Sequence, residues 1–183
     1  MELRDILDEF GNKTGKTGER GKELNQGEYY LIVDVWIINS QGEFLLSKRV
    51  PTAEPEPNRW QPTTGNVVAG EDSISAAIRE AEEELGIMLN PENGEMIKRY
   101  IAWADAIIDV WLFRQDININ DVVLQPRETN DAMWATSEVI EQLIKNDEFL
   151  NSHRVPYINE LFDKLTGRVS RFHARKMAEQ TKF

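Results

Sequence analysis

The stretch from Gly65 to Ile87 constrains this chain more than any other, because it joins an amphipathic helix to a run of acidic residues. Hydrophobic residues recur at helical spacing in its second half, which predicts a helix with one apolar stripe. Asp72 or Ser73 is placed to cap the start of this helix, and Gly86 is placed to end it. The predicted stripe consists of Ile74, Ile78, Ala81 and Leu85.

Three glutamates of the same helix share a different face. Glu80, Glu83 and Glu84 lie at positions i, i+3 and i+4, where like charges destabilise an isolated helix by roughly 0.2–0.5 kcal/mol per pair. The common meaning of such a run is a solvated acidic face. A hard cation bound by oxygen ligands would reverse the sign of the charge term, and magnesium suits a site of one or two carboxylates, waters and phosphates.

The wider spacing favours the metal interpretation. Gly65, then five residues, Glu71, then seven residues and Arg79-Glu80-Ala81-x-Glu83-Glu84-x-Gly86-Ile87 resembles the Nudix box of the Nudix hydrolases. The resemblance implies a loop–helix–loop that binds magnesium, with manganese as the alternative, beside a substrate diphosphate. It implies metal ligands at Glu80, Glu83 and Glu84, a bracing pair of Glu71 and Arg79, and substrate contact at Gly65.

Composition limits the class of protein. The 183 residues are 40% hydrophobic and 29% charged, which predicts one soluble globular domain: an N-terminal extension 1–27, a core 28–145 and a helical extension 146–183. Without cysteine there is no disulfide, thiolate metal site or thiol nucleophile. No apolar run reaches membrane length and the start lacks a signal peptide, so we expect a cytoplasmic protein. The net charge of −11 disfavours a nucleic acid polymer or membrane as partner, but not a small nucleotide whose diphosphate a cation neutralises.

Three segments before the box carry strand and turn signals. Gly15-Lys16-Thr17 resembles the end of a phosphate-binding P-loop, but Phe10 stands where that motif needs glycine, so a hairpin or surface loop is predicted. Tyr29 to Ile38 is apolar at nearly every position and predicts a strand buried on both faces. Asp34 interrupts this strand and, as a buried carboxylate, needs a partner or lies near a site. Glu43 to Lys48 predicts a returning strand.

A loop with four prolines, from Val50 to Pro62, leads directly into the box. It is well placed to cover a substrate, and Arg49 at its start is a candidate substrate-binding residue. Trp60 has two interpretations. It either stacks on a nucleobase or, as the more frequent role of a large aromatic, anchors the loop onto the core.

The chain after the box alternates strands and helices, which predicts an α/β/α sandwich around a mixed sheet, as the Nudix resemblance also implies. The predicted helices are Glu138 to Lys145, capped by Thr136 or Ser137, and one opened by Pro156 and ended by Gly167, with a basic tail from Arg168. The last of these helices has an expected buried stripe of Tyr157, Leu161, Phe162 and Leu165. The predicted strands are Met96 to Ala104, Ala106 to Gln115, Val122 to Leu124 and Ala132 to Ala135.

Three functions are compatible with the sequence. The first is magnesium-dependent hydrolysis of a nucleoside-diphosphate-linked compound, in which Glu83 or Glu128 takes a proton from the attacking water. The second is prenyl-diphosphate isomerisation, because residues near 8 to 49 resemble the branch related to type I isopentenyl-diphosphate isomerase. Thr64 and Asn66 stand where those isomerases carry cysteine and histidine, which argues against it. The third is a non-catalytic ligand-sensing module. The Nudix resemblance also leaves a homodimer open.

Overall fold

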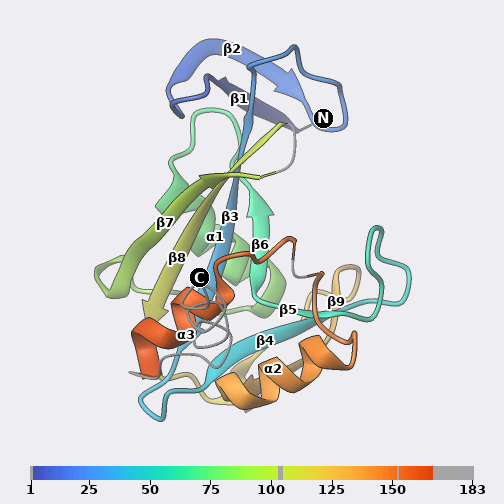
Figure 1. Cartoon of the computed structure of the whole chain (residues 1–183), viewed down its shortest axis with the longest axis vertical. Coiled ribbons are helices and arrows are strands. Elements are labelled where there is room, and N and C mark those ends of the chain that lie inside the picture. The colour runs from blue at the N-terminus through green and yellow to red at the C-terminus, as the bar shows by residue number, and fades with distance from the viewer. Residues whose placement is uncertain (1, 103–104, 152, 167–183) are drawn as a thin grey trace, which may run out of the picture.

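The computed structural model describes residues 2–102, 105–151 and 153–166. Within these residues, seven strands form the main sheet in the order β5-β4-β3-β8-β7, with β6 paired to β3 and β9 paired to β4, while β1 and β2 form a separate sheet (Figure 1). The strands are β1 (Leu3–Leu7), β2 (Lys13–Glu19), β3 (Tyr30–Ile38), β4 (Phe44–Arg49), β5 (Trp60–Gln61), β6 (Thr63–Asn66), β7 (Gly94–Ile101), β8 (Ala106–Arg114) and β9 (Thr129–Ala135). The helices are α1 (Ser73–Leu85), α2 (Ser137–Lys145), α3 (Ile158–Thr166) and the short 3-10 turns η1 (Pro91–Asn93) and η2 (Ile119–Asp121).

Strand β3 lies at the centre of the sheet. Its β-branched and aromatic residues favour an extended backbone and are buried on both faces, as the sequence predicted. It pairs in parallel with β8 from Tyr30 opposite Ala106 to Ile38 opposite Arg114. It pairs antiparallel with β4 and β6, which makes the sheet mixed.

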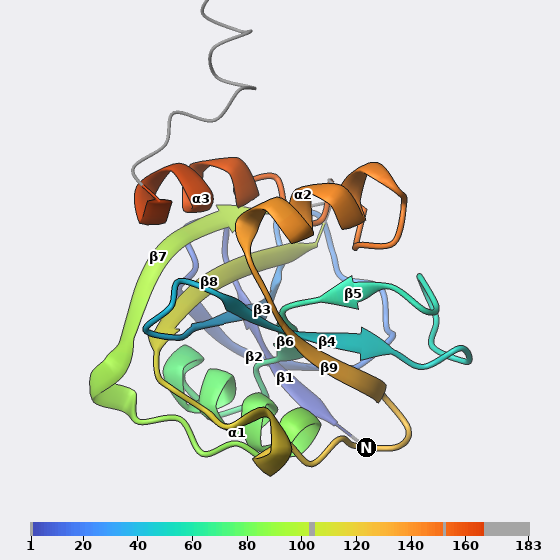
Figure 2. The ribbon, with the colours of Figure 1, turned by 90° about the horizontal axis from the view of Figure 1, so that it is seen from below.

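Helices cover both faces of this sheet. Helix α1 packs on one face through a buried cluster that includes Val33, Ala77 and Leu85. Helices α2 and α3 cover the other face, where the cluster includes Trp36 and Phe149. Figure 2 shows α1 on one side of the strands and α2 and α3 on the opposite side. The α/β/α sandwich is therefore confirmed. In the described part of the chain, no helix is both long enough and apolar enough to cross a membrane.

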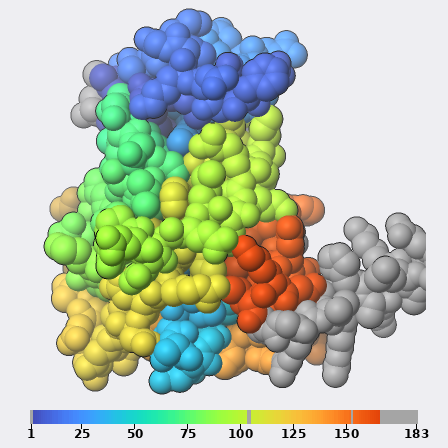
Figure 3. Space-filling model, turned by 90° about the vertical axis from the view of Figure 1, so that its left-hand side faces the viewer, coloured from blue at the N-terminus to red at the C-terminus, as the bar shows by residue number. Residues whose placement is uncertain are grey.

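The N-terminal hairpin β1–β2 caps one end of the molecule (Figures 1 and 3). Gly15-Lys16-Thr17 lies within β2, which confirms the hairpin interpretation over a P-loop. The hairpin also holds the loop that enters α1: the Ala69 N–H donates to the Leu3 carbonyl at 2.8 Å, and the Gly70 N–H donates to the Asp5 carboxylate at 2.9 Å. Residues that the sequence assigned to an extension therefore support the box.

The strand predicted from Val122 to Leu124 is wrong. The N–H groups of this segment pair with the carboxyl end of α1 instead: Val123 donates to the Leu85 carbonyl at 2.8 Å, and Gln125 donates to the Glu84 carbonyl at 3.1 Å. The last four carbonyls of a helix lack partners within the helix, so this segment satisfies two of them. Gly167 and the tail from Arg168 lie outside the described residues. The stripe expected on α3 is confirmed, with Tyr157, Leu161 and Phe162 buried and Leu165 packed against them.

Candidate functional site

Helix α1 has the predicted start and end. The Asp72 carboxylate accepts a hydrogen bond from the Ser75 N–H at 2.9 Å and so caps the first turn. Gly86 adopts a left-handed conformation at φ 67°, where glycine carries no Cβ penalty, and its N–H donates to the Glu82 carbonyl. These caps fix the length of the helix and the direction in which its glutamates point.

The acidic face of α1 is not a solvated face. Glu80 is 8% exposed and Glu84 is 3% exposed, whereas the Glu83 side chain remains 51% exposed. Burial raises the pKa of Glu80 to about 7, although Arg79 partly opposes that shift. Burial raises the pKa of Glu84 well above its usual range, and the neighbouring charges of Glu80 and Glu128 raise it further. The two carboxyl groups are thus held out of water side by side, where their ionised forms are disfavoured.

Gly65 lies directly beneath Glu80. It belongs to β6 opposite Val33 of β3, and a Cβ added to it would overlap the carboxyl group of Glu80. The glycine is therefore required by close approach of a side chain rather than by an unusual backbone angle. Its absent side chain leaves the space in which the Glu80 carboxylate lies.

Arg79 ties the loop before α1 to the helix. Its Nε and Nη2 donate to both oxygens of Glu71 at 3.0 Å, and Nη2 also donates to the Asn66 carbonyl at 2.8 Å. Its Nη1 donates to Glu80 at 2.8 Å and to Glu83 at 3.1 Å. Hydrogen bonds to Glu71, more than any other cause, raise the pKa of Arg79 above its usual value. The bidentate contact is the geometry expected of a pair that braces the loop.

The donor atoms fit a hard divalent cation. Glu84 Oε2 is buried and forms no hydrogen bond of ordinary geometry among the described residues. The Thr63 hydroxyl also lacks such a bond, but it lies close enough to the Glu84 carboxyl to oppose the rise in its pKa. An unpaired buried carboxylate oxygen is costly unless a cation completes it. Within residues 2–102, 105–151 and 153–166, no three acidic, histidine or cysteine side chains converge into a ready-made metal site. Arg79 Nη1 donates to both Glu80 and Glu83, so a cation held between these two carboxylates would have to displace it.

Two further candidate residues lie near the acidic pair formed by Glu80 and Glu84. Glu128 is exposed on the loop before β9, and its charge is close enough to raise the pKa of both Glu80 and Glu84. Arg49 is half-buried at the end of β4, where its Nε donates to the Glu56 carbonyl at 3.1 Å. Burial is the main cause that lowers the pKa of Arg49, and the charges of Glu84 and Glu128 oppose this shift. The fold thus brings together residues that are far apart in sequence.

Trp60 lies away from the acidic pair. Its indole is 9% exposed within the cluster covered by α2 and α3, whereas the box helix packs on the opposite cluster. The Lys48 amine lies 5.4 Å from the ring centroid, at a pocket of about 430 Å³. This burial supports the interpretation of Trp60 as an anchor of the proline-rich loop.

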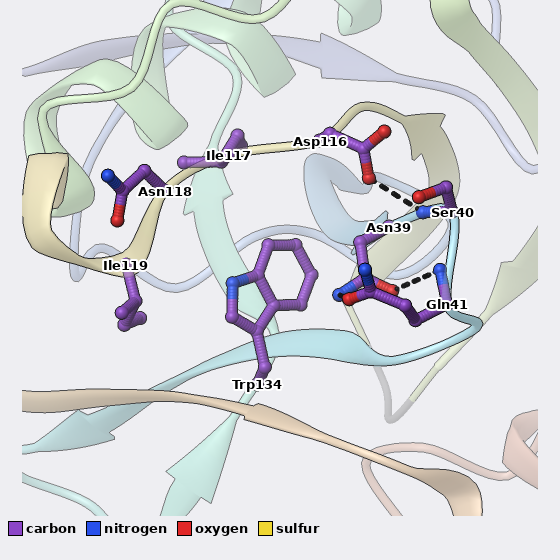
Figure 4. A pocket seen from close by; sticks show the side chains of 8 residues that line it. All are labelled: Asn39, Ser40, Gln41, Asp116, Ile117, Asn118, Ile119 and Trp134. Atoms are coloured by element: carbon purple, nitrogen blue, oxygen red, sulfur yellow. Dashed lines mark hydrogen bonds between the residues drawn. The ribbon is translucent and has the colours of Figure 1, made fainter.

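A second surface pocket, of about 490 Å³, also lies outside the box. Trp134 of β9 lies at its centre, between the turn that follows β3 and the segment that follows β8 (Figure 4). The Asp116 carboxylate accepts a hydrogen bond from the Ser40 N–H at 2.7 Å and so joins those two segments. Neither pocket contains a glutamate of the acidic helix.

Comparison with known proteins agrees with the geometry of the box. The model of the NUDIX domain matches residues 28–156. This chain belongs to the Nudix family. It is 37% identical over 166 residues to an uncharacterized Nudix hydrolase of Listeria monocytogenes, covering 89% of this chain and 95% of the relative.

A solved structure and a more distant relative extend the comparison. The crystal structure of DR0079 from Deinococcus radiodurans superposes with a TM-score of 0.70 at 20% identity, covering 87% of this chain and 98% of that one. An isopentenyl-diphosphate Delta-isomerase of Photorhabdus laumondii is 24% identical over 156 residues, covering 81% of this chain and 87% of the relative. The family model and the more similar relatives, which are named as Nudix hydrolases, show that the protein is a Nudix enzyme.

Two supports of the site were not predicted from the sequence. The N-terminal hairpin contacts the end of β6 through Arg4, whose guanidinium donates to the Asn66 side chain at 2.9 Å. The Thr63 hydroxyl is buried on the face of β6 that α1 covers. For Thr63 a signal existed, because it lies two residues before Gly65 and therefore on the same face of the strand. For Arg4 the chain offers no such periodicity.

Proposed function

We propose that this protein is a magnesium-dependent hydrolase that cleaves the diphosphate of a nucleoside-diphosphate-linked or related small molecule, with manganese as the alternative cation. The environment of Glu84 carries the proposal. The Glu84 carboxylate is buried beside that of Glu80, and one of its oxygens has no hydrogen bond. Burying ionised groups in this way costs folding free energy, which a bound cation offsets. Glu80, Glu83 and Glu84 would hold that cation.

When bound, the metal polarises the diphosphate and stabilises the leaving oxygen. The chain's own residues then have separate roles. Glu128 accepts a proton from the attacking water, and Glu83 is the second candidate for this base. Arg49 supplies a fixed positive charge toward the diphosphate from the side of Glu84. Glu71 and Arg79 keep the loop and helix in register, so that Gly65 can approach the substrate.

Relation to the isomerase branch is a separate proposal. Similarity of residues near 8 to 49 and the match to an isomerase support descent from that branch. Common descent does not imply isomerase activity here, because Thr64 and Asn66 replace the cysteine and histidine of those isomerases and the chain has no cysteine at all. A ligand-sensing module is disfavoured for a different reason, since every carboxylate of the box is present.

A substrate panel tests the proposal. The parent protein is incubated with ADP-ribose, nucleotide sugars, dinucleotides, nucleoside triphosphates and isopentenyl diphosphate, and phosphate release and product mass are measured. We expect magnesium-dependent cleavage of at least one diphosphate, abolished by chelator and by Glu84→Gln. Glu82→Gln is the matched control, because Glu82 is exposed on the same helix and should keep full activity.

Each other outcome contradicts part of the proposal. Full activity in excess chelator, or in Glu84→Gln, would remove the metal site. Formation of dimethylallyl diphosphate from isopentenyl diphosphate would favour the isomerase. Tight binding of a nucleotide without turnover would favour the sensing module.

A further inference from the structure

A buried carboxylate lies on the sheet face opposite the acidic helix. Asp34 of β3 is 7% exposed, and its Oδ1 accepts a hydrogen bond from the Thr64 hydroxyl at 3.1 Å. Its Oδ2 accepts a hydrogen bond from the Tyr157 hydroxyl at 2.7 Å. The Trp36 indole N–H in turn donates to the Tyr157 oxygen at 2.9 Å. Both oxygens of Asp34 are therefore bonded by side chains from two other segments, Thr64 of β6 and Tyr157.

Thr64 links this network to the candidate site. Side chains alternate across a strand, so Thr64 of β6 points away from the face that its neighbours Thr63 and Gly65 present to α1. Gly65 is in contact with the Glu80 carboxylate, and Thr63 carries an unpaired hydroxyl on the same face. A shift of Thr64 would therefore move the backbone on which Glu80 rests.

Tyr157 comes from the segment before α3, one residue beyond the part that the family model matches. The same segment also holds the proline-rich loop. The Asn151 N–H donates to Glu56 Oε1 at 2.9 Å, and Arg154 Nη1 pairs with Glu56 Oε2 at 3.2 Å. Glu56 in turn accepts a hydrogen bond from Arg49 through its carbonyl. The C-terminal segment thus contacts the loop beside Arg49 directly, and reaches Thr64 of β6 through Asp34 of β3.

Charge makes the contact between Tyr157 and Asp34 strong. Burial raises the pKa of Asp34 to about 6, and the hydrogen bonds from Tyr157 and Thr64 oppose this shift. Asp34 is therefore mainly ionised at neutral pH, and hydrogen bonds to an ionised carboxylate are roughly twice as strong as neutral ones. The positive charge of Arg154 also opposes the rise in the pKa of Asp34.

We propose that Tyr157 and Asp34 are positioning residues that fix β6, through Thr64, so that Gly65 and Glu80 keep the contact needed for turnover. This inference rests on the proposed hydrolase function. It assigns to the C-terminal segment a part in catalysis that no residue of the box supplies. Neither residue touches substrate; both act through the backbone of β6.

Tyr157→Phe tests the proposal, with Tyr100→Phe as its matched control. Tyr100 lies on the same face, 5.7 Å from the Tyr157 ring, but its hydroxyl donates to the Arg154 carbonyl instead of to Asp34. We expect Tyr157→Phe to lower kcat by about tenfold with KM within about twofold, the loss expected when one hydrogen bond to a charged group is removed. Tyr100→Phe should retain the kcat of the parent. Equal kcat in the two variants would overturn the proposal.

Thr64→Val and hydrogen exchange give two independent readouts. Because Thr64 and Tyr157 act in one chain, the double variant should be no slower than the poorer single variant, and additive losses would contradict the coupling. Exchange at the amides of residues 64–66 should be faster in Tyr157→Phe than in Tyr100→Phe. This second measurement needs no turnover, so it decides the positioning role even if no substrate of the panel is cleaved. Unchanged exchange at these amides would reject it.

Discussion

Glu80→Gln should stabilise the metal-free protein at alkaline pH. Burial is the main cause that raises the pKa of Glu80 from 4.5 to about 7, so the folded protein resists ionising a group that the unfolded chain ionises freely. Glutamine matches the neutral form of the side chain, and its carbonyl can still accept the hydrogen bond from Arg79. The substitution therefore removes the cost of ionising a buried carboxyl group and keeps the size and shape of the side chain.

The size and sign of the effect follow from linkage. The pKa of Glu80 is higher in the folded protein than in the unfolded chain. The neutral carboxyl therefore contributes fully to the free energy of unfolding below pH 4.5, and this contribution is lost as pH rises through 7. A difference of about 2.5 units at 1.36 kcal/mol per unit gives about 3 kcal/mol. The gain of Glu80→Gln over the parent should grow from under about 1 kcal/mol at pH 5 to about 3 kcal/mol at pH 8. For a chain of this length, each kcal/mol corresponds to about 2–4 °C in Tm.

Urea unfolding in the presence of chelator, at pH 5 and pH 8, measures this difference. Glu82→Gln removes the same charge from an exposed position of α1 and should show no such growth with pH. Added magnesium should stabilise the parent, by about 2.7 kcal/mol at one hundred times its Kd, and stabilise Glu80→Gln far less. A gain that is the same at both pH values, or a loss of stability at pH 8, would refute the assignment of Glu80 as a buried, metal-binding carboxylate.

Two other substitutions test separate parts of the site. Glu128→Gln should lower turnover by about 10²–10⁴-fold with an unchanged Tm, because Glu128 is exposed and its loss removes a base rather than packing; unchanged turnover on the best panel substrate would move the base to Glu83. Gly65→Ala should displace the Glu80 carboxylate, since the new Cβ occupies its place, and should weaken magnesium binding in a calorimetric titration. Parent-like magnesium affinity in that variant would show that the approach of Glu80 to Gly65 is dispensable.

The box helix could be predicted from sequence because its signals are local. Asp72 and Gly86 mark its ends by backbone chemistry. The predicted stripe locates the packed face only in part, because Ala81 and Leu85 are buried whereas Ile74 and Ile78 are partly buried. The depth at which Glu80 and Glu84 are buried could not be predicted in the same way. Their burial depends on Gly65 and on strand β6, which the hydrophobic pattern does not place beside the helix.

Other features escaped prediction because distant segments decide them. Val122 to Leu124 has the composition of a strand, but the unpaired carbonyls of α1 attract its N–H groups. Asp34 was expected to have a partner, which the structure confirms, but that partner is Tyr157, 123 residues later. Pairings of this kind leave no periodic trace in a single sequence.

The parallel pairing of β3 with β8 has a consequence for the order in which the protein acquires activity during synthesis. The whole box lies in the connection between these two strands, so α1 is complete before the partner of β3 leaves the ribosome. Until Ala106–Arg114 is available, the central strand lacks its parallel neighbour and part of the surface on which α1 packs. Contacts of such long sequence separation form slowly. We therefore expect a chain arrested before residue 106 to carry the complete acidic motif without the fold that buries it.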